Sequence, residues 1–170
     1  MANNDPIMAH YVTIDGLTPA DFKGFTDNFL VGCQNMPPPP KGKVAFNALE
    51  TLEGRPVAHH RMDPDTMFVS ARSTIVTYYT VPAGDNHTFF VSSRGNADLE
   101  KKYAANIGKD VIATLEVNYM HFEATERGTN VTHIVCSKPN GSIPDMIVKN
   151  MSKNQAGAIL KIAEALKAKK

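Results

Sequence analysis

The chain has 170 residues, a formal net charge of +1 at pH 7, and 42% apolar and 21% charged residues. This length fits one domain with a single core, and the composition predicts a folded protein rather than a disordered one. A net charge this close to zero argues against nucleic acid as a partner, because a surface that follows phosphates is usually strongly basic.

The N-terminal sequence MANNDPIMAHYV has neither the basic start nor the apolar stretch of a secretory signal, and no run approaches the roughly 20 apolar residues of a membrane span. We therefore expect a cytoplasmic protein without a transmembrane segment. The two cysteines, Cys33 and Cys136, form no CxxC pair, so they predict no metal site and no cofactor.

The first predicted elements are a short strand over residues 10–14 and a helix that begins at Thr18. Threonine is a common N-cap, Pro19 suits the first helical position, and Asp21 favours the positive end of the helix dipole. The apolar stripe of this helix consists of Phe22, Phe25, Phe29 and Leu30. We expect the helix to end near Gly32.

Four prolines follow at residues 37–40. Proline continues neither a helix nor a strand ladder, so this run predicts a stiff, extended linker. A site for a proline-recognising partner, which would make the protein an adaptor, is the alternative hypothesis.

The middle of the chain contains strand-like runs separated by turn signals such as Gly84-Asp85-Asn86, and it predicts an antiparallel meander. The six runs are residues 43–50, 56–62, 73–80, 87–93, 111–122 and 130–137. The connection over residues 94–110 is longer than a hairpin needs and looks helical in its middle. Such connections often serve as lids or binding loops, and a plain insertion is the alternative.

The final segment opens with NGSIPDMIVKNM, residues 140–151. Ser142 and Asp145 resemble a capping box, and Pro144 is tolerated in a first helical turn. We expect a helix of roughly 25 residues, about 37 Å long, with a kink or looser turn at Gly157. Its apolar side consists of Met146, Ile147, Met151, Ile159, Ile162, Ala163 and Leu166. A helix of this length can lie across the whole sheet.

This order of elements is the helix-grip architecture, and two segments resemble START (steroidogenic acute regulatory protein-related lipid transfer) domains. MDPDTMFVSARSTIVTYYT is similar to a START strand with its approach, and THIVCSKPNGSIPDMIVKNM is similar to the closing strand, turn and terminal helix. The resemblance covers residues 43–166. The chain departs from the family in lacking its N-terminal elements and in carrying Tyr78 where many START domains have a cavity-facing arginine.

The resemblance implies an α+β helix-grip fold, a curved antiparallel sheet of about seven strands around a long C-terminal helix, with a shorter helical segment after the first strand. It also implies a single START-like domain over residues 1–170 with an internal cavity for a phospholipid, sphingolipid or sterol. The implied function is lipid binding and transfer, with transient contact with membranes and no catalysis. Residues 94–110 and the final helix would then open as a gate.

The resemblance places one set of side chains in the cavity. Those ligand-binding residues are Val76, Tyr78, Phe89, Val91, Glu116, Asn118, Met120, Phe122, Val131, His133, Val135, Ile147, Met151 and Ile159. A two-residue turn at Arg127-Gly128 would pair Phe122 with His133 and Met120 with Val135, which agrees with this set. The apolar Leu115, Val117 and Tyr119 would then face outward, and a slip of one residue would exchange the two faces.

Two other hypotheses concern the polar residues. Glu116 or His133 could act as general acid or base in a cyclase-like or hydrolase-like enzyme on the same fold. Alternatively, the polar residues of the set could satisfy one another or bind buried water. The adjacent His59 and His60 point to opposite faces of a strand, which argues against metal chelation by this pair.

Overall fold

The computed structural model describes residues 7–36, 42–64, 69–143 and 157–169. Its centre is one curved antiparallel sheet in the order β1-β8-β7-β5-β4-β3-β2, and β6 adds to it by parallel pairing with β4. The strands are β1 (Ile7–Asp15), β2 (Lys43–Leu52), β3 (Arg55–Asp63), β4 (Arg72–Ala83), β5 (Asn86–Ser92), β6 (Val111–Ile112), β7 (Thr114–Ala124) and β8 (Gly128–Lys138). All six strands predicted in the meander are present.

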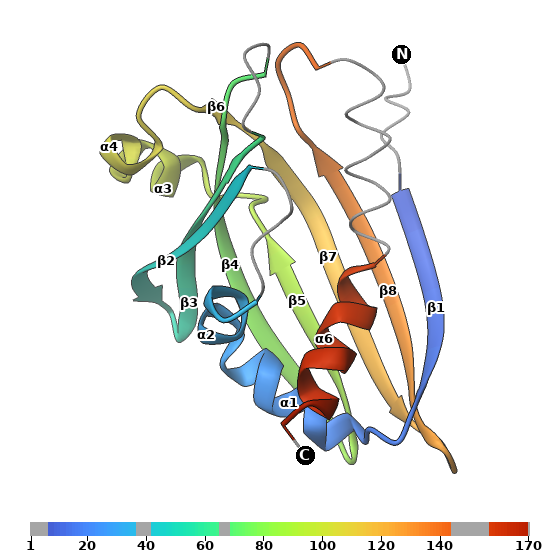
Figure 1. Cartoon of the computed structure of the whole chain (residues 1–170). Coiled ribbons are helices and arrows are strands. Elements are labelled where there is room, and N and C mark those ends of the chain that lie inside the picture. The colour runs from blue at the N-terminus through green and yellow to red at the C-terminus, as the bar shows by residue number, and fades with distance from the viewer. Residues whose placement is uncertain (1–6, 37–41, 65–68, 144–156, 170) are drawn as a thin grey trace.

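Helices occupy both sides of the sheet (Figure 1). They are α1 (Pro19–Asp27), α2 (Phe29–Gln34), α3 (Ala97–Lys102), α4 (Ala104–Ile107) and α6 (Ala158–Lys167). The main core lies where α1, α2 and α6 meet the concave face of the sheet. This arrangement is the predicted α+β helix-grip fold.

The predicted start of the first helix is confirmed. Thr18 has extended backbone angles, and both its N–H and its hydroxyl donate to a carboxylate oxygen of Asp21, at 2.7 and 2.9 Å. The predicted single helix is divided, however, because Asn28 leaves the helical conformation between α1 and α2. Its side-chain amide donates to the carbonyl of Gly24 at 3.0 Å, a local hydrogen bond that competes with the continuing helix.

The β7–β8 hairpin shows a shifted register that leaves the predicted face unchanged. Phe122 pairs with Val131 and Met120 with His133, so the two predicted pairings were each wrong by two residues. The reason is the position of the turn, which still has two residues but lies at Glu126-Arg127, one residue earlier than expected: the N–H of Thr125 donates to the carbonyl of Gly128 at 2.9 Å, and the N–H of Gly128 donates to the carbonyl of Thr125 at 3.4 Å. Since side chains alternate with period two, a shift of two keeps the same residues on the inner face.

Residues 94–110 do not form the predicted lid. Leu99 and Ile107 of this segment pack with Val57 and Ile75 in a second, smaller core apart from the main one. Asp110 fastens the end of the segment by accepting hydrogen bonds from Arg61 and from Ser73, both at 2.7 Å. The segment therefore covers the convex face of β3 and β4, opposite the main core.

The last helix agrees with the prediction where it is described. In α6, Ile159, Ile162 and Ala163 are buried in the main core, which is the apolar side expected from the sequence. Gly157 is the N-cap of this helix. The rest of the predicted helix, with Ile147 and Met151, and the proline run at 37–40 lie outside the described residues.

Candidate functional site

A cavity of about 410 Å³ lies on the concave side of the sheet. Strands β2, β3, β4, β5, β7 and β8 contribute to its walls, together with one residue each of α2 and α6. Its lining residues are Phe29, Val44, Phe46, His60, Met62, Arg72, Thr74, Val76, Val91, Ala113, Thr114, Leu115, Asn118, Met120, His133, Val135, Ser137, Lys138, Pro139 and Ala158. A volume of this size is within the range of small-molecule sites, about 300 to 1,000 Å³.

Six residues of the predicted set line this cavity. They are Val76, Val91, Asn118, Met120, His133 and Val135. They come from four neighbouring strands, and the period-two alternation of each strand turns them to the same face. These six residues therefore form one wall of the cavity.

Five other predicted residues, Tyr78, Phe89, Phe122, Val131 and Ile159, are buried beside the cavity rather than in its lining. Phe29 of α2 packs its ring 5.2 Å from that of Tyr78 and 4.9 Å from that of Phe89. Phe122 stacks on Phe22 of α1 with ring centroids 4.8 Å apart, and Ile159 of α6 is 2% exposed. These side chains, and Val131 with them, fill the part of the concave face that α1 and α6 cover.

Glu116 is displaced from the cavity by a β-bulge. Leu115 pairs with Ser137 and Val117 with Cys136, so Glu116 is an extra residue without a partner across the ladder. Such an extra residue reverses the alternation of side chains on one side of the bulge. Leu115, which we expected to face outward, consequently lines the cavity, while Glu116 forms an ion pair with Lys138 at 3.1 Å.

The opposite wall was missed by sequence reasoning. His60 and Met62 of β3 face the cavity, and the His60 ring stacks on Phe46 of β2 with centroids 4.4 Å apart and an interplanar angle of 6°. The predicted opposition of the two adjacent histidines is confirmed, because His59 bonds to Ser73 in the network at Asp110, away from the cavity. The signal that could have found this wall is the alternation of Ala58, His60 and Met62.

The two histidines of the cavity are held neutral. Burial lowers the pKa of His133 to about 4, with a smaller contribution from the charge of His10, and the His133 ring bonds to the Asn118 carbonyl oxygen at 3.0 Å. Burial likewise lowers the pKa of His60 to about 4, with a smaller effect of His59. At pH 7 neither ring therefore carries a charge into the cavity.

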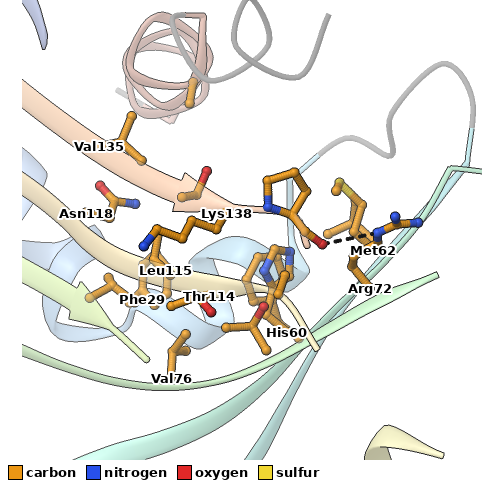
Figure 2. A pocket seen from close by; sticks show the side chains of 18 of the residues that line it. Phe29, His60, Met62, Arg72, Val76, Thr114, Leu115, Asn118, Val135 and Lys138 are labelled. Atoms are coloured by element: carbon orange, nitrogen blue, oxygen red, sulfur yellow. Dashed lines mark hydrogen bonds between the residues drawn. The ribbon is translucent and has the colours of Figure 1, made fainter. Parts of the chain in front are cut away.

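Arg72 and Lys138 are the charged residues of the lining, and Arg72 is the more buried of the two. Arg72 is only 4% exposed, and burial lowers the pKa of its guanidinium. Nε and Nη2 donate to the backbone carbonyls of Pro139 and Asn140 at 3.4 and 3.2 Å, and Nη1 donates to the carbonyl of Ser70. Figure 2 shows this guanidinium at one end of the cavity, with Asn118 and Val135 at the other end.

No cluster of three or more metal-binding side chains occurs within the described residues. Across the same parts of the chain, no helix has the length and apolarity needed to cross a bilayer.

Comparisons with known proteins give a match at the level of structure alone. No protein-family model and no curated protein sequence matches the chain. The structure of human STARD10 aligns with a TM-score of 0.72 and 15% identity, covering 97% of this chain and 66% of that one. The human StarD13 (DLC2) lipid transfer and protein localization domain aligns with a TM-score of 0.68 and 15% identity, covering 96% and 78%.

A bacterial structure is similar over almost the whole length of both chains. It is residues 25–204 of a STAR-related lipid transfer protein from Xanthomonas axonopodis, with a TM-score of 0.64 and 16% identity, covering 98% of this chain and 90% of that one. At these identities the likeness concerns the fold. The chain has the START fold, and it spans 66% of the length of the STARD10 chain it matches.

Proposed function

We propose that the protein binds a hydrophobic ligand, a lipid or a sterol, in the cavity and carries it between membranes without catalysing a reaction. The observation that carries this proposal is the cavity of about 410 Å³ on the concave face, whose walls are mostly aliphatic, aromatic and thioether side chains. Well-packed interiors have few voids larger than a water molecule, so a void of this size needs a ligand or a functional reason.

The energetics of transfer favour such a ligand. Each buried CH₂ group contributes about 0.8 kcal/mol, so an acyl chain of sixteen carbons would gain roughly 12 kcal/mol before ordering costs are subtracted. A cavity lined mostly by apolar side chains therefore stabilises a molecule that water does not dissolve. The solved structures with the same fold include proteins described by their names as lipid transfer proteins, which supports the same proposal for this chain.

The enzymatic alternative has less support from the site. Glu116, one of its two candidate acids or bases, lies on the bulge and is paired with Lys138 instead of lining the cavity. His133 does line it, but burial keeps its pKa near 4, and one ring nitrogen is engaged with Asn118. A group that is neutral at pH 7 and already hydrogen-bonded is better suited to orient a ligand than to accept a proton.

A cavity-filling substitution with a matched control tests the proposal. Val135 faces the cavity and is 2% exposed, whereas its neighbour Ile134 lies on the opposite face of β8. We expect Val135→Phe to weaken the binding of a fluorescent acyl-chain probe by about tenfold or more, because the ring occupies the space of several CH₂ groups. Ile134→Phe should leave the probe affinity within about twofold of the wild type, since it adds volume outside the cavity.

Native mass spectrometry of the protein taken directly from cells provides a second readout. A co-purifying lipid that is present with wild-type protein and absent with Val135→Phe would support the proposal. Equal probe binding by wild type and Val135→Phe, or no binding by either, would overturn it. Cytoplasmic location and transient membrane contact belong to the same proposal, and probe transfer between two vesicle populations measures the contact.

A further inference from the structure

We propose that the ligand carries an oxyanion, a carboxylate or a phosphate group, and that Arg72 binds this group at one end of the cavity. This inference rests on the proposed function and adds the chemical class of the ligand. It distinguishes anionic acyl lipids from neutral sterols and neutral acyl lipids.

The guanidinium of Arg72 has donors to spare. An arginine side chain has five N–H groups and accepts no hydrogen bond. Three of them are used, one from each nitrogen, on the carbonyls of Ser70, Pro139 and Asn140. Nη1 and Nη2 each keep one further N–H for which the described residues provide no acceptor. Two N–H groups on one guanidinium are what a carboxylate or phosphate binds in a bidentate pair.

Among the described residues, the positive charge of Arg72 also has no counter-charge. Two other basic residues near the sheet have carboxylate partners, Arg61 with Asp110 at 2.7 Å and Lys138 with Glu116 at 3.1 Å. Arg72 is far more buried than these, yet in residues 7–36, 42–64, 69–143 and 157–169 no carboxylate lies within ion-pair distance of it. A buried charge without a counter-charge is costly, and an anionic ligand would remove this cost.

The rest of the cavity contributes no competing charge. His60 and His133 are neutral at pH 7 because burial lowers the pKa of each to about 4. Lys138 reaches the lining, but its ammonium group is paired with Glu116. One cation at one end and apolar side chains over most of the remaining surface match a molecule with a charged head and a hydrocarbon tail.

The turn after β8 holds the guanidinium in place before any ligand arrives. Asn140 and Gly141 both have left-handed backbone angles, with φ of 51° and 64°. The side-chain amide of Asn140 fixes this turn by donating to the backbone carbonyl of Ile112 at 2.9 Å. The backbone carbonyl of Asn140 accepts a hydrogen bond from Arg72. A donor that is already fixed loses little entropy on binding, so Arg72 is preorganised for a charged head group.

The experiment compares three ligands with the same sixteen-carbon chain and different heads: hexadecanoate, hexadecyl phosphate and hexadecanol. Each is titrated against wild-type protein that holds a neutral fluorescent acyl probe, and its displacement of the probe gives its affinity. We expect at least one of the two anions to bind about tenfold or more tightly than the alcohol, as charge-assisted hydrogen bonds require. The order of the two anions then tells a carboxylate head from a phosphate head.

Two variants assign the preference to Arg72. In Arg72→Met, a side chain of similar length without charge, the preference for the anions should fall below about threefold while hexadecanol still binds. Arg61→Met, which removes an arginine from the network at Asp110 outside the cavity lining, should keep the wild-type preference.

The outcomes separate this inference from the proposed function. Displacement of the probe by all three ligands with equal affinity in the wild type would overturn the inference and leave the carrier function standing. Failure of the probe to bind at all would overturn both. The wild-type series decides the question even where Arg72→Met does not fold, because it needs no variant.

Discussion

The concave face of the sheet has a filled end and a hollow end, and the same strands build both. At the filled end, under α1 and α6, Phe22, Phe122 and Phe89 are each at most 1% exposed and pack against one another or against Phe29. At the hollow end, Val76, Val91 and Val135 leave a cavity of about 410 Å³. Strand β5 contributes Phe89 to the filled end and Val91, two residues further on, to the lining of the cavity.

The difference shows that side-chain size, rather than backbone topology, decides where this fold is open. Both ends have the same strand order and the same inward alternation. At the filled end, aromatic rings from the sheet meet rings from α1 and α2 and leave no room. At the hollow end, the valines of β4, β5 and β8 are too short to reach the opposite wall.

The largest expected effect is on the filled end. Phe122 is 1% exposed and stacks on Phe22 at 4.8 Å and on His87 at 4.6 Å. Phe122→Ala should lower the free energy of unfolding by about 3 to 5 kcal/mol, since it loses the burial of the ring and leaves a cavity. Urea denaturation measures this loss.

The matched change at the hollow end is Val91→Ala. It should cost about 1 to 2 kcal/mol, which is the transfer free energy of two methyl groups, because the neighbouring space is already empty. Equal losses for the two variants would mean that the two ends do not differ in packing.

The second prediction concerns pH and the histidines of the hollow end. His60 and His133 have a pKa of about 4 in the folded protein and about 6.5 when unfolded, so the folded state disfavours their protonation. Their contribution to stability is complete above pH 6.5 and is lost as the pH falls from 6.5 to 4. At pH 5 each histidine should cost about 2 kcal/mol relative to pH 7, which makes about 4 kcal/mol for both.

The variant His133→Gln isolates the contribution of His133 to this loss of stability at low pH. Its loss of stability between pH 7 and pH 5 should be smaller than that of the wild type by about 2 kcal/mol, measured by urea denaturation at both values. The same loss in both proteins would show that His133 is not desolvated in the folded state.

Local signals predicted much of the fold because each has a direct physical cause. The hydrogen bonds between Thr18 and Asp21 begin α1 where the sequence indicated. Strand-forming residues and turn signals identified the six strands, and the START resemblance, rather than the alternation of apolar residues, indicated the inner face of β7 and β8, even though the turn was placed one residue too late. The division of the first helix was missed because the Asn28 side chain bonds back to Gly24, a choice that apolar periodicity does not reveal.

The site was less predictable, because its shape depends on contacts between distant segments. The bulge at Glu116 exchanges the positions of Glu116 and Leu115, and nothing in a strand pattern marks the extra residue. Arg72 sat within the quoted START-like segment as part of a strand, but its role depends on carbonyls 67 and 68 residues further along the chain. The second core under residues 94–110 was missed for the same reason.

The smallest expected effect on the free energy of unfolding comes from replacing one valine by phenylalanine at each end of the concave face. Val131 and Val91 both face inward from the same sheet, with 1% and 3% exposure, but only Val91 lines the cavity. Val131→Phe should cost about 1 to 3 kcal/mol, because a ring does not fit beside Phe122 and Val12 without displacing them.

Val91→Phe should change the free energy of unfolding by less than about 1 kcal/mol, because its ring enters space that is already empty. Urea denaturation of both variants in ligand-free protein measures the difference. Because the two substitutions add the same atoms to the same kind of strand position, packing against neighbours is the main variable between them. A cost at Val91 that equals the cost at Val131 would mean that the hollow end closes when no ligand is bound, and the size of valine would then not explain the cavity.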